Sequence, residues 1–125
     1  VHAVSTYQRI IASRGTIKSV NVGVYWDVNC TNAISSIDWG MLEPGATRNT
    51  TVYLKNEGNA PITLFLNLSN WNPAETEGFI DLSWNYDGQN LQPEKVLLLT
   101  LTLTVAENIT GITSFSFDIV IIGEG

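Results

Sequence analysis

Residues 96–105 read VLLLTLTLTV, and this stretch decides the fold class. Large apolar side chains alternate with threonine, so one side of the segment is apolar and the other polar. A period of two belongs to a β-strand, whose successive side chains point to opposite faces. The apolar set is Leu97, Leu99, Leu101, Leu103 and Val105. We therefore expect a strand about 33 Å long with one face on a core.

Similar alternation continues on both sides of this strand. After it, TGITSFSFDIVIIG places Phe115, Phe117, Ile119 and Ile121 on one face. Before it, FIDLSWNY does the same with Ile80, Leu82 and Trp84. Asp87–Gly88 is a strong two-residue hairpin signal if LQP continues a strand. The second half of the chain therefore indicates antiparallel strands joined by short turns.

The first half follows the same rule. Alternation predicts one strand from Val20 to Val28, then strands in SSIDWGML, TRNTTVYLKN and PITLFLNLSN, and a loop or single helical turn in WNPAETEG. In EPGA, Pro44 and Gly45 fit the central positions of a type II turn. Seven or eight strands without crossover helices predict an all-β, two-sheet antiparallel β-sandwich, jelly-roll-like or immunoglobulin-like. We place this single domain at residues 15–125, after an N-terminal extension of residues 1–14.

Composition excludes several classes of function. The formal net charge is −6 and the six basic residues are scattered, so we expect no nucleic-acid partner. No apolar run reaches the roughly 18 residues of a membrane-spanning helix, so we expect no span in this chain. The single cysteine, Cys30, cannot form an intrachain disulfide.

Catalytic and metal-binding residues are not indicated. The only histidine is His2, no nucleophile-elbow motif occurs, and carboxylates do not gather at metal-ligand spacing. We expect no catalytic residue, no metal site, no cofactor and no enzymatic activity.

Four tryptophans raise a binding alternative. Trp26, Trp39 and Trp84 fall on the alternating apolar faces, which predicts core positions. Trp71, in SNWNP, is predicted to lie in a loop and is the candidate for an exposed contact. A secreted carbohydrate-binding β-sandwich that uses Trp71 is therefore the alternative function.

Covalent glycans are a further expectation. The Asn-x-Ser/Thr sequence that accepts N-linked sugar occurs four times, at Asn29, Asn49, Asn67 and Asn108. Asn67 falls on the outward face of its predicted strand, where a sugar would not disturb a core.

Three stretches occur in a recognisable order: SRGTIKSVNV, then LEPGAT, then VYLKNEGNAPITLFL. They resemble the opening strand, the Pro-Gly turn and the Lys-Asn-x-Gly strand pair of biofilm-matrix fibre proteins of the TasA and camelysin type. The likeness to archaeal bundling-pilus subunits of the same architecture is stronger. It covers residues 13 to 68.

This resemblance implies an extracellular protein, released by removal of a signal peptide, that polymerises with copies of itself by donor-strand complementation. The N-terminal segment of one subunit would pair into a groove of the next, and the fibres would cross-link cells in a biofilm. The candidate donor-strand residues are Val4, Thr6, Tyr7, Gln8, Ile10, Ile11 and Ala12. Neither face of this segment is purely apolar, and a terminal strand within its own sheet is the alternative.

Overall fold

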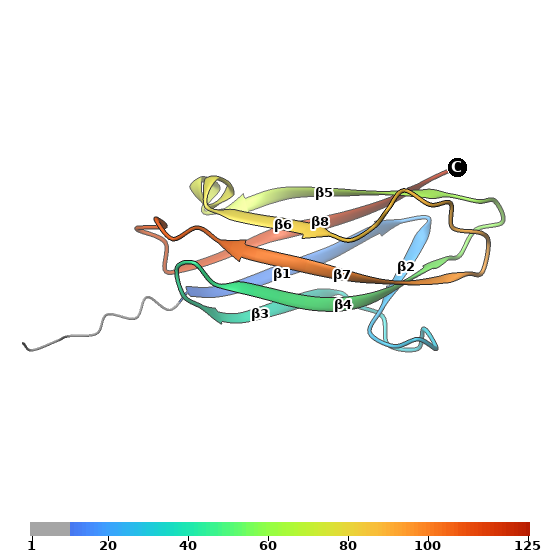
Figure 1. Ribbon diagram of the computed structural model, residues 1–125, viewed down its shortest axis with the longest axis horizontal. Coiled ribbons are helices and arrows are strands. Elements are labelled where there is room, and N and C mark those ends of the chain that lie inside the picture. The colour runs from blue at the N-terminus through green and yellow to red at the C-terminus, as the bar shows by residue number, and fades with distance from the viewer. Residues whose placement is uncertain (1–10) are drawn as a thin grey trace, which may run out of the picture.

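Two four-stranded sheets pack face to face in the computed structural model, which describes residues 11–125 (Figure 1). The first sheet has the order β3 (Ser36–Leu42), β1 (Ile11–Val20), β8 (Ser114–Glu124) and β5 (Thr63–Asn72). The second has the order β2 (Val22–Tyr25), β4 (Thr47–Asn56), β7 (Val96–Val105) and β6 (Ile80–Trp84). One short 3-10 helix, η1 (Ala74–Gly78), joins β5 to β6. The predicted all-β, two-sheet sandwich is confirmed.

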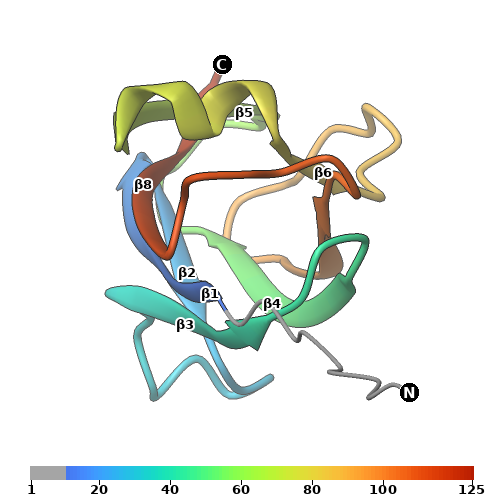
Figure 2. The ribbon, with the colours of Figure 1, turned by 90° about the vertical axis from the view of Figure 1, so that its left-hand side faces the viewer.

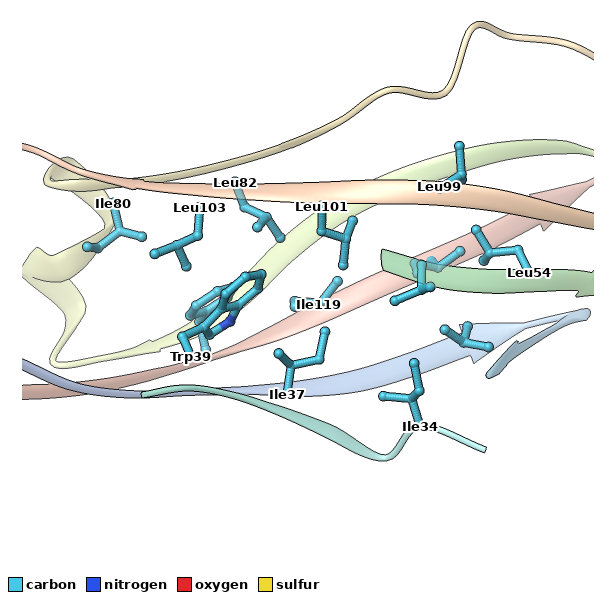
Figure 3. Close-up of a cluster of buried hydrophobic side chains, with 14 of the residues drawn as sticks. Ile34, Ile37, Trp39, Leu54, Ile80, Leu82, Leu99, Leu101, Leu103 and Ile119 are labelled. Atoms are coloured by element: carbon cyan, nitrogen blue, oxygen red, sulfur yellow. The ribbon is translucent and has the colours of Figure 1, made fainter. Parts of the chain in front are cut away.

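The core lies between the sheets, where the predicted alternation placed it. The apolar residues of β7 from Leu99 to Val105 are buried at every second position, and those of β8 from Phe115 to Ile121 face them. Figure 3 shows side chains of both sheets, among them Leu101 and Ile119, pointing toward one another.

Asn21 carries the chain from one sheet to the other. Its φ of 60° lies in the left-handed region, which asparagine tolerates better than most residues. β1 ends at Val20 in the first sheet and β2 begins at Val22 in the second. The single strand expected from Val20 to Val28 is therefore wrong. The alternation of apolar and polar residues does not show that the chain turns into the other sheet at Asn21. Trp26 is 44% exposed and lies outside any strand, so its predicted core position is also wrong.

β1 begins before the predicted domain boundary. Ile11 is fully buried and pairs with Leu42, and Ala12 pairs with Ser114. The boundary expected after residue 14 therefore falls inside β1. Ile11 and Ala12 belong to a strand of their own domain, which corrects their assignment to a donor segment. β1 and β8 run parallel, whereas every other strand pairing is antiparallel among residues 11–125.

Two residues of the quoted motifs have structural roles. A Cβ added to Gly15 would lie 3.1 Å from Cδ1 of Ile119 and 3.2 Å from Nε1 of Trp39, so glycine leaves room for the buried indole. Asn56 is fully buried and its side chain holds a corner together. Its amide nitrogen donates to the carbonyl oxygens of Ala60 (2.8 Å) and Leu91 (2.9 Å), and its oxygen accepts from the Gly58 N–H (2.9 Å).

The turns give a mixed result. The Glu43–Ala46 turn is confirmed, with Gly45 at φ +82° and a 3.0 Å hydrogen bond from Ala46 N–H to the Glu43 carbonyl. The condition for a two-residue hairpin at Asp87–Gly88 is not met, because LQP does not continue a strand and residues 85–95 form a long connection. There the Asp87 carboxylate accepts the Gln89 N–H locally, and Leu91 forms an isolated bridge with Ile62 of the other half of the chain.

Candidate functional site

β5 and β6 are the two unpaired sheet edges on one side of the sandwich. Each stands at the end of its sheet, and within residues 11–125 no strand pairs with the outer side of either. Seen along the strands, the two edges lie on the same side and η1 crosses between them (Figure 2). We call these two neighbouring edges, with the side chains between them, the β5–β6 seam.

Apolar side chains along the seam are only partly covered. Leu66 pairs with Ile121 and Leu68 with Ile119, so both leucines point toward the core, but they stay half-buried while the two isoleucines are fully buried. On the β6 side Trp84 pairs with the fully buried Leu101 and is itself half-buried. The core is therefore less well sealed here than in its interior.

A β-bulge places Trp71 among the half-buried apolar side chains of the seam. Asn70 has a φ of 56°, and the pairing of β5 with β8 shifts register between Ser69 and Asn72. This extra residue lets Trp71 stack on Phe117, with ring centroids 4.5 Å apart and an interplanar angle of 17°. The loop position predicted for Trp71 is wrong: it lies in β5, half-buried, with one ring face against the core.

The backbone of β5 also faces the seam at alternate residues. Ile62 exchanges two hydrogen bonds with Leu91, of 3.0 and 2.7 Å, and the Leu64 N–H donates to the Tyr86 hydroxyl at 3.1 Å. Because backbone groups of alternate residues point to the same side of a strand, Leu66 and Leu68 also present their N–H and C=O groups there. Tyr86 and Leu91 thus occupy one end of this edge, and the part beyond Leu64 is left without a strand partner among the described residues.

The β6 edge has a matching arrangement. Phe79 accepts a 2.8 Å hydrogen bond from Ala106 on the β7 side. By the same alternation, Leu82 and Trp84 turn their backbone groups away from β7 and toward the seam. Both edges therefore offer backbone donors and acceptors to an additional strand.

The opposite side of the sandwich is sealed by the chain itself. The Arg48 guanidinium of β4 donates to the carbonyl oxygens of Trp39 (3.3 Å) and Met41 (2.9 Å) on β3, which joins the two sheets. Further along this side, Ala33 forms a bridge with Tyr25 at the end of β2. Figure 2 shows β3 and β4 close together on this side. In contrast, the edges of the β5–β6 seam are joined by no such contact beyond Leu64 within residues 11–125.

The predicted site residues fall in several places. Val4, Thr6, Tyr7, Gln8 and Ile10 lie outside the described residues. The four candidate glycosylation sites, at Asn29, Asn49, Asn67 and Asn108, are all exposed. They do not cluster: the first lies in the loop after β2, two lie in β4 and β5, and the last precedes β8.

Metal-ligating side chains do not cluster in the described part of the chain. Residues 11–125 contain no group of three His, Cys, Asp or Glu side chains placed to share a metal ion. The Asp27 carboxylate accepts the backbone N–H groups of Thr31 and Asn32 and the Thr31 hydroxyl, and these bonds lower the pKa of Asp27. Asp27 therefore orders its own loop. No helix within residues 11–125 has the length and hydropathy of a membrane span.

The seam was missed by sequence reasoning because its residues read as ordinary core positions. Leu66, Leu68 and Trp84 alternate like fully buried neighbours, and only the strand order shows that they lie at an edge. No family model and no curated protein matches this chain.

Proposed function

We propose that this chain is a structural subunit of an extracellular filament, a pilus or biofilm-matrix fibre, whose subunits join head to tail by donor-strand complementation. Residues 1–10 of one subunit form the strand that fills the β5–β6 seam of the next. The observation that carries the proposal is the seam itself, with two unpaired edges on either side of a half-buried apolar row.

The physical reason is that such a seam is unfavourable while it is empty. Unpaired edges and partly covered apolar side chains promote association with another strand. An inserted strand would pair with backbone groups at Leu66 and Leu68 and would cover Trp71 and Trp84. The donor lies outside the domain that accepts it, so the contact does not close on itself and a filament grows.

The length of the N-terminal segment suits this role. Ten extended residues reach about 33 Å, and the β5 edge from Leu66 to Trp71 spans about 20 Å. Ile11 is the first residue of β1. We therefore take residues 1–10 as the donor segment, in place of residues 1–14.

The decisive experiment deletes residues 1–10 and leaves β1 intact. We expect the truncated chain to fold as a monomer and to form no filaments under the electron microscope. A synthetic peptide of residues 1–10 should then bind it one to one and raise its melting temperature, whereas a peptide of the same composition in scrambled order should not. The proposal would be contradicted if the truncated chain formed filaments. It would also be contradicted if the truncated chain folded but did not bind the native peptide.

A further inference from the structure

The outer face of the first sheet carries an exposed apolar strip. Phe65 of β5 is 48% exposed and lies opposite Ile122 of β8, which in turn lies opposite Val20 of β1. Val120 stands one row further along the same face of β8. These side chains point away from the core, so the sandwich itself gives them no packing role.

Asn67 lies beside this strip on the same face. It follows Phe65 by two residues along β5 and is opposite Val120. Its side chain is exposed and makes no hydrogen bond to another residue of the described chain. Ser69, two residues further on, completes the acceptor sequence for N-linked sugar. Asn67 therefore shares a sheet face with an exposed aromatic ring two residues before it on the same strand.

The other three acceptor sites lack this neighbour. The residues two positions before their asparagines are Asp27, Thr47 and Ala106, none of which is aromatic. In the Asn29 site the Thr31 hydroxyl is already bound by the Asp27 carboxylate. The Asn29 loop also carries exposed apolar side chains, Trp26 and Val28, but they lie outside any strand. Among the four sites, only Asn67 lies on a strand with an aromatic side chain two positions before it on the same sheet face.

We propose that Asn67 carries an N-linked saccharide and that the first sugar ring packs on Phe65 and Val120. One side of a pyranose ring presents C–H groups, and the negative face of an aromatic ring attracts them. The sugar covers the exposed apolar strip, while its hydroxyl groups remain in water. Glycosylation at this position thus stabilises the folded domain.

The attachment is a group transfer from a lipid-phosphate-linked saccharide, catalysed by an oligosaccharyltransferase. The Asn67 amide nitrogen attacks the anomeric carbon and forms a C–N bond. The anomeric C–O bond to phosphate breaks, the lipid phosphate leaves with the electron pair, and the amide gives up one proton to a base of the transferase. No group is oxidised or reduced.

The first test is mass spectrometry of the Asn67 peptide from protein purified out of its source organism. We expect the mass of this peptide to be raised by one or more sugar residues, with the sugar on Asn67. The Ser69→Ala variant keeps the asparagine and should yield the unmodified peptide. An unmodified Asn67 in the wild-type protein overturns the proposal.

The second test separates stacking from mere attachment. Thermal unfolding compares glycosylated protein with its Ser69→Ala counterpart, first with Phe65 present and then in the Phe65→Ala background. We expect the sugar to raise the melting temperature by about 2–5 °C with Phe65 present and by little without it. Leu98→Ala, an exposed leucine on the outer face of the other sheet, is the matched control and should leave the gain intact. An equal gain in the Phe65→Ala background overturns the stacking.

Discussion

Asn21 and Asn70 each hold a left-handed backbone conformation at a point where a strand changes course. Asn21, at φ 60°, turns the chain between sheets, and Asn70, at φ 56°, makes the bulge that places Trp71 over Phe117. Asparagine is well suited to both positions, because a β-branched residue in this region is strongly strained. Its abundance in this chain therefore has structural reasons besides the acceptor sites for sugar.

Asn21→Val should lower the free energy of unfolding by about 1–2 kcal/mol, since a β-branched side chain clashes with its own backbone at positive φ. Asn21→Gly, which has no such clash, should stay close to the wild type. Urea unfolding of the chain lacking residues 1–10 measures both. Equal stability of the valine and glycine variants would show that the corner does not depend on this φ.

Also at the residue scale, Asp118 makes the stability of the folded protein depend on pH. Hydrogen bonds from Lys18 and Asn70, with N–O distances of 2.7 and 2.6 Å, lower the pKa of Asp118 from its ordinary 3.8. A carboxyl whose pKa is lowered by folding stabilises the protein above its unfolded-state pKa, and this contribution is lost as pH falls through the folded-state pKa. The Asp118 contribution should therefore be present near neutral pH and absent in strong acid.

Asp118→Asn tests this contribution, because asparagine cannot titrate. The melting temperature of the variant should lie below that of the wild type near pH 7, and the two should converge toward about pH 2. Both proteins lose stability in acid through their other carboxylates, so the difference between the curves is the quantity to follow. A constant offset across the whole range would exclude the ion pair as its source.

At the scale of elements, alternation predicted the long strands well. β4, β7 and β8 follow their predicted faces, because each strand has one face on the core and a period of two records that burial directly. It failed at Asn21 and Asn70, where one residue in a left-handed conformation resets the period. Alternation cannot predict strand order, because it shows which face of a strand is buried but not which strand is its neighbour. The parallel pairing of β1 with β8 and the β5–β6 seam could not be predicted for that reason.

Ile11→Ala should show that β1 is part of the domain and not of the donor segment. Ile11 is fully buried, so the substitution should cost about 2–5 kcal/mol of unfolding free energy. Val20→Ala, at the exposed end of the same strand, is the control and should cost far less. Both are measured by urea unfolding of the chain lacking residues 1–10. A small effect at Ile11 would mean that the strand begins later.

At the scale of the whole molecule, substitutions of Leu68 and Leu98 distinguish an effect on filament assembly from an effect on folding. Leu68→Arg places a charge in the seam and should abolish filaments, because an inserted strand would bury that charge unpaired. Leu98→Arg makes the same change on the exposed outer face of β7 and should leave filaments intact. Electron microscopy scores assembly, and circular dichroism confirms that both variants fold. Filaments of normal length from Leu68→Arg would exclude the seam as the acceptor.

In the proposed filament, the position of β1 would determine how tension enters a subunit. β1 has β3 on one side and β8 on the other, and its parallel register with β8 runs unbroken from Ala12 to Val20. In a fibre linked through residues 1–10, a pull enters the domain at Ile11 and runs along the strand axis. The hydrogen bonds on both sides of β1 are then loaded in shear and must fail together, whereas a strand peeled from an edge releases them one at a time. A subunit of the proposed filament would therefore receive mechanical load through a central strand of its first sheet.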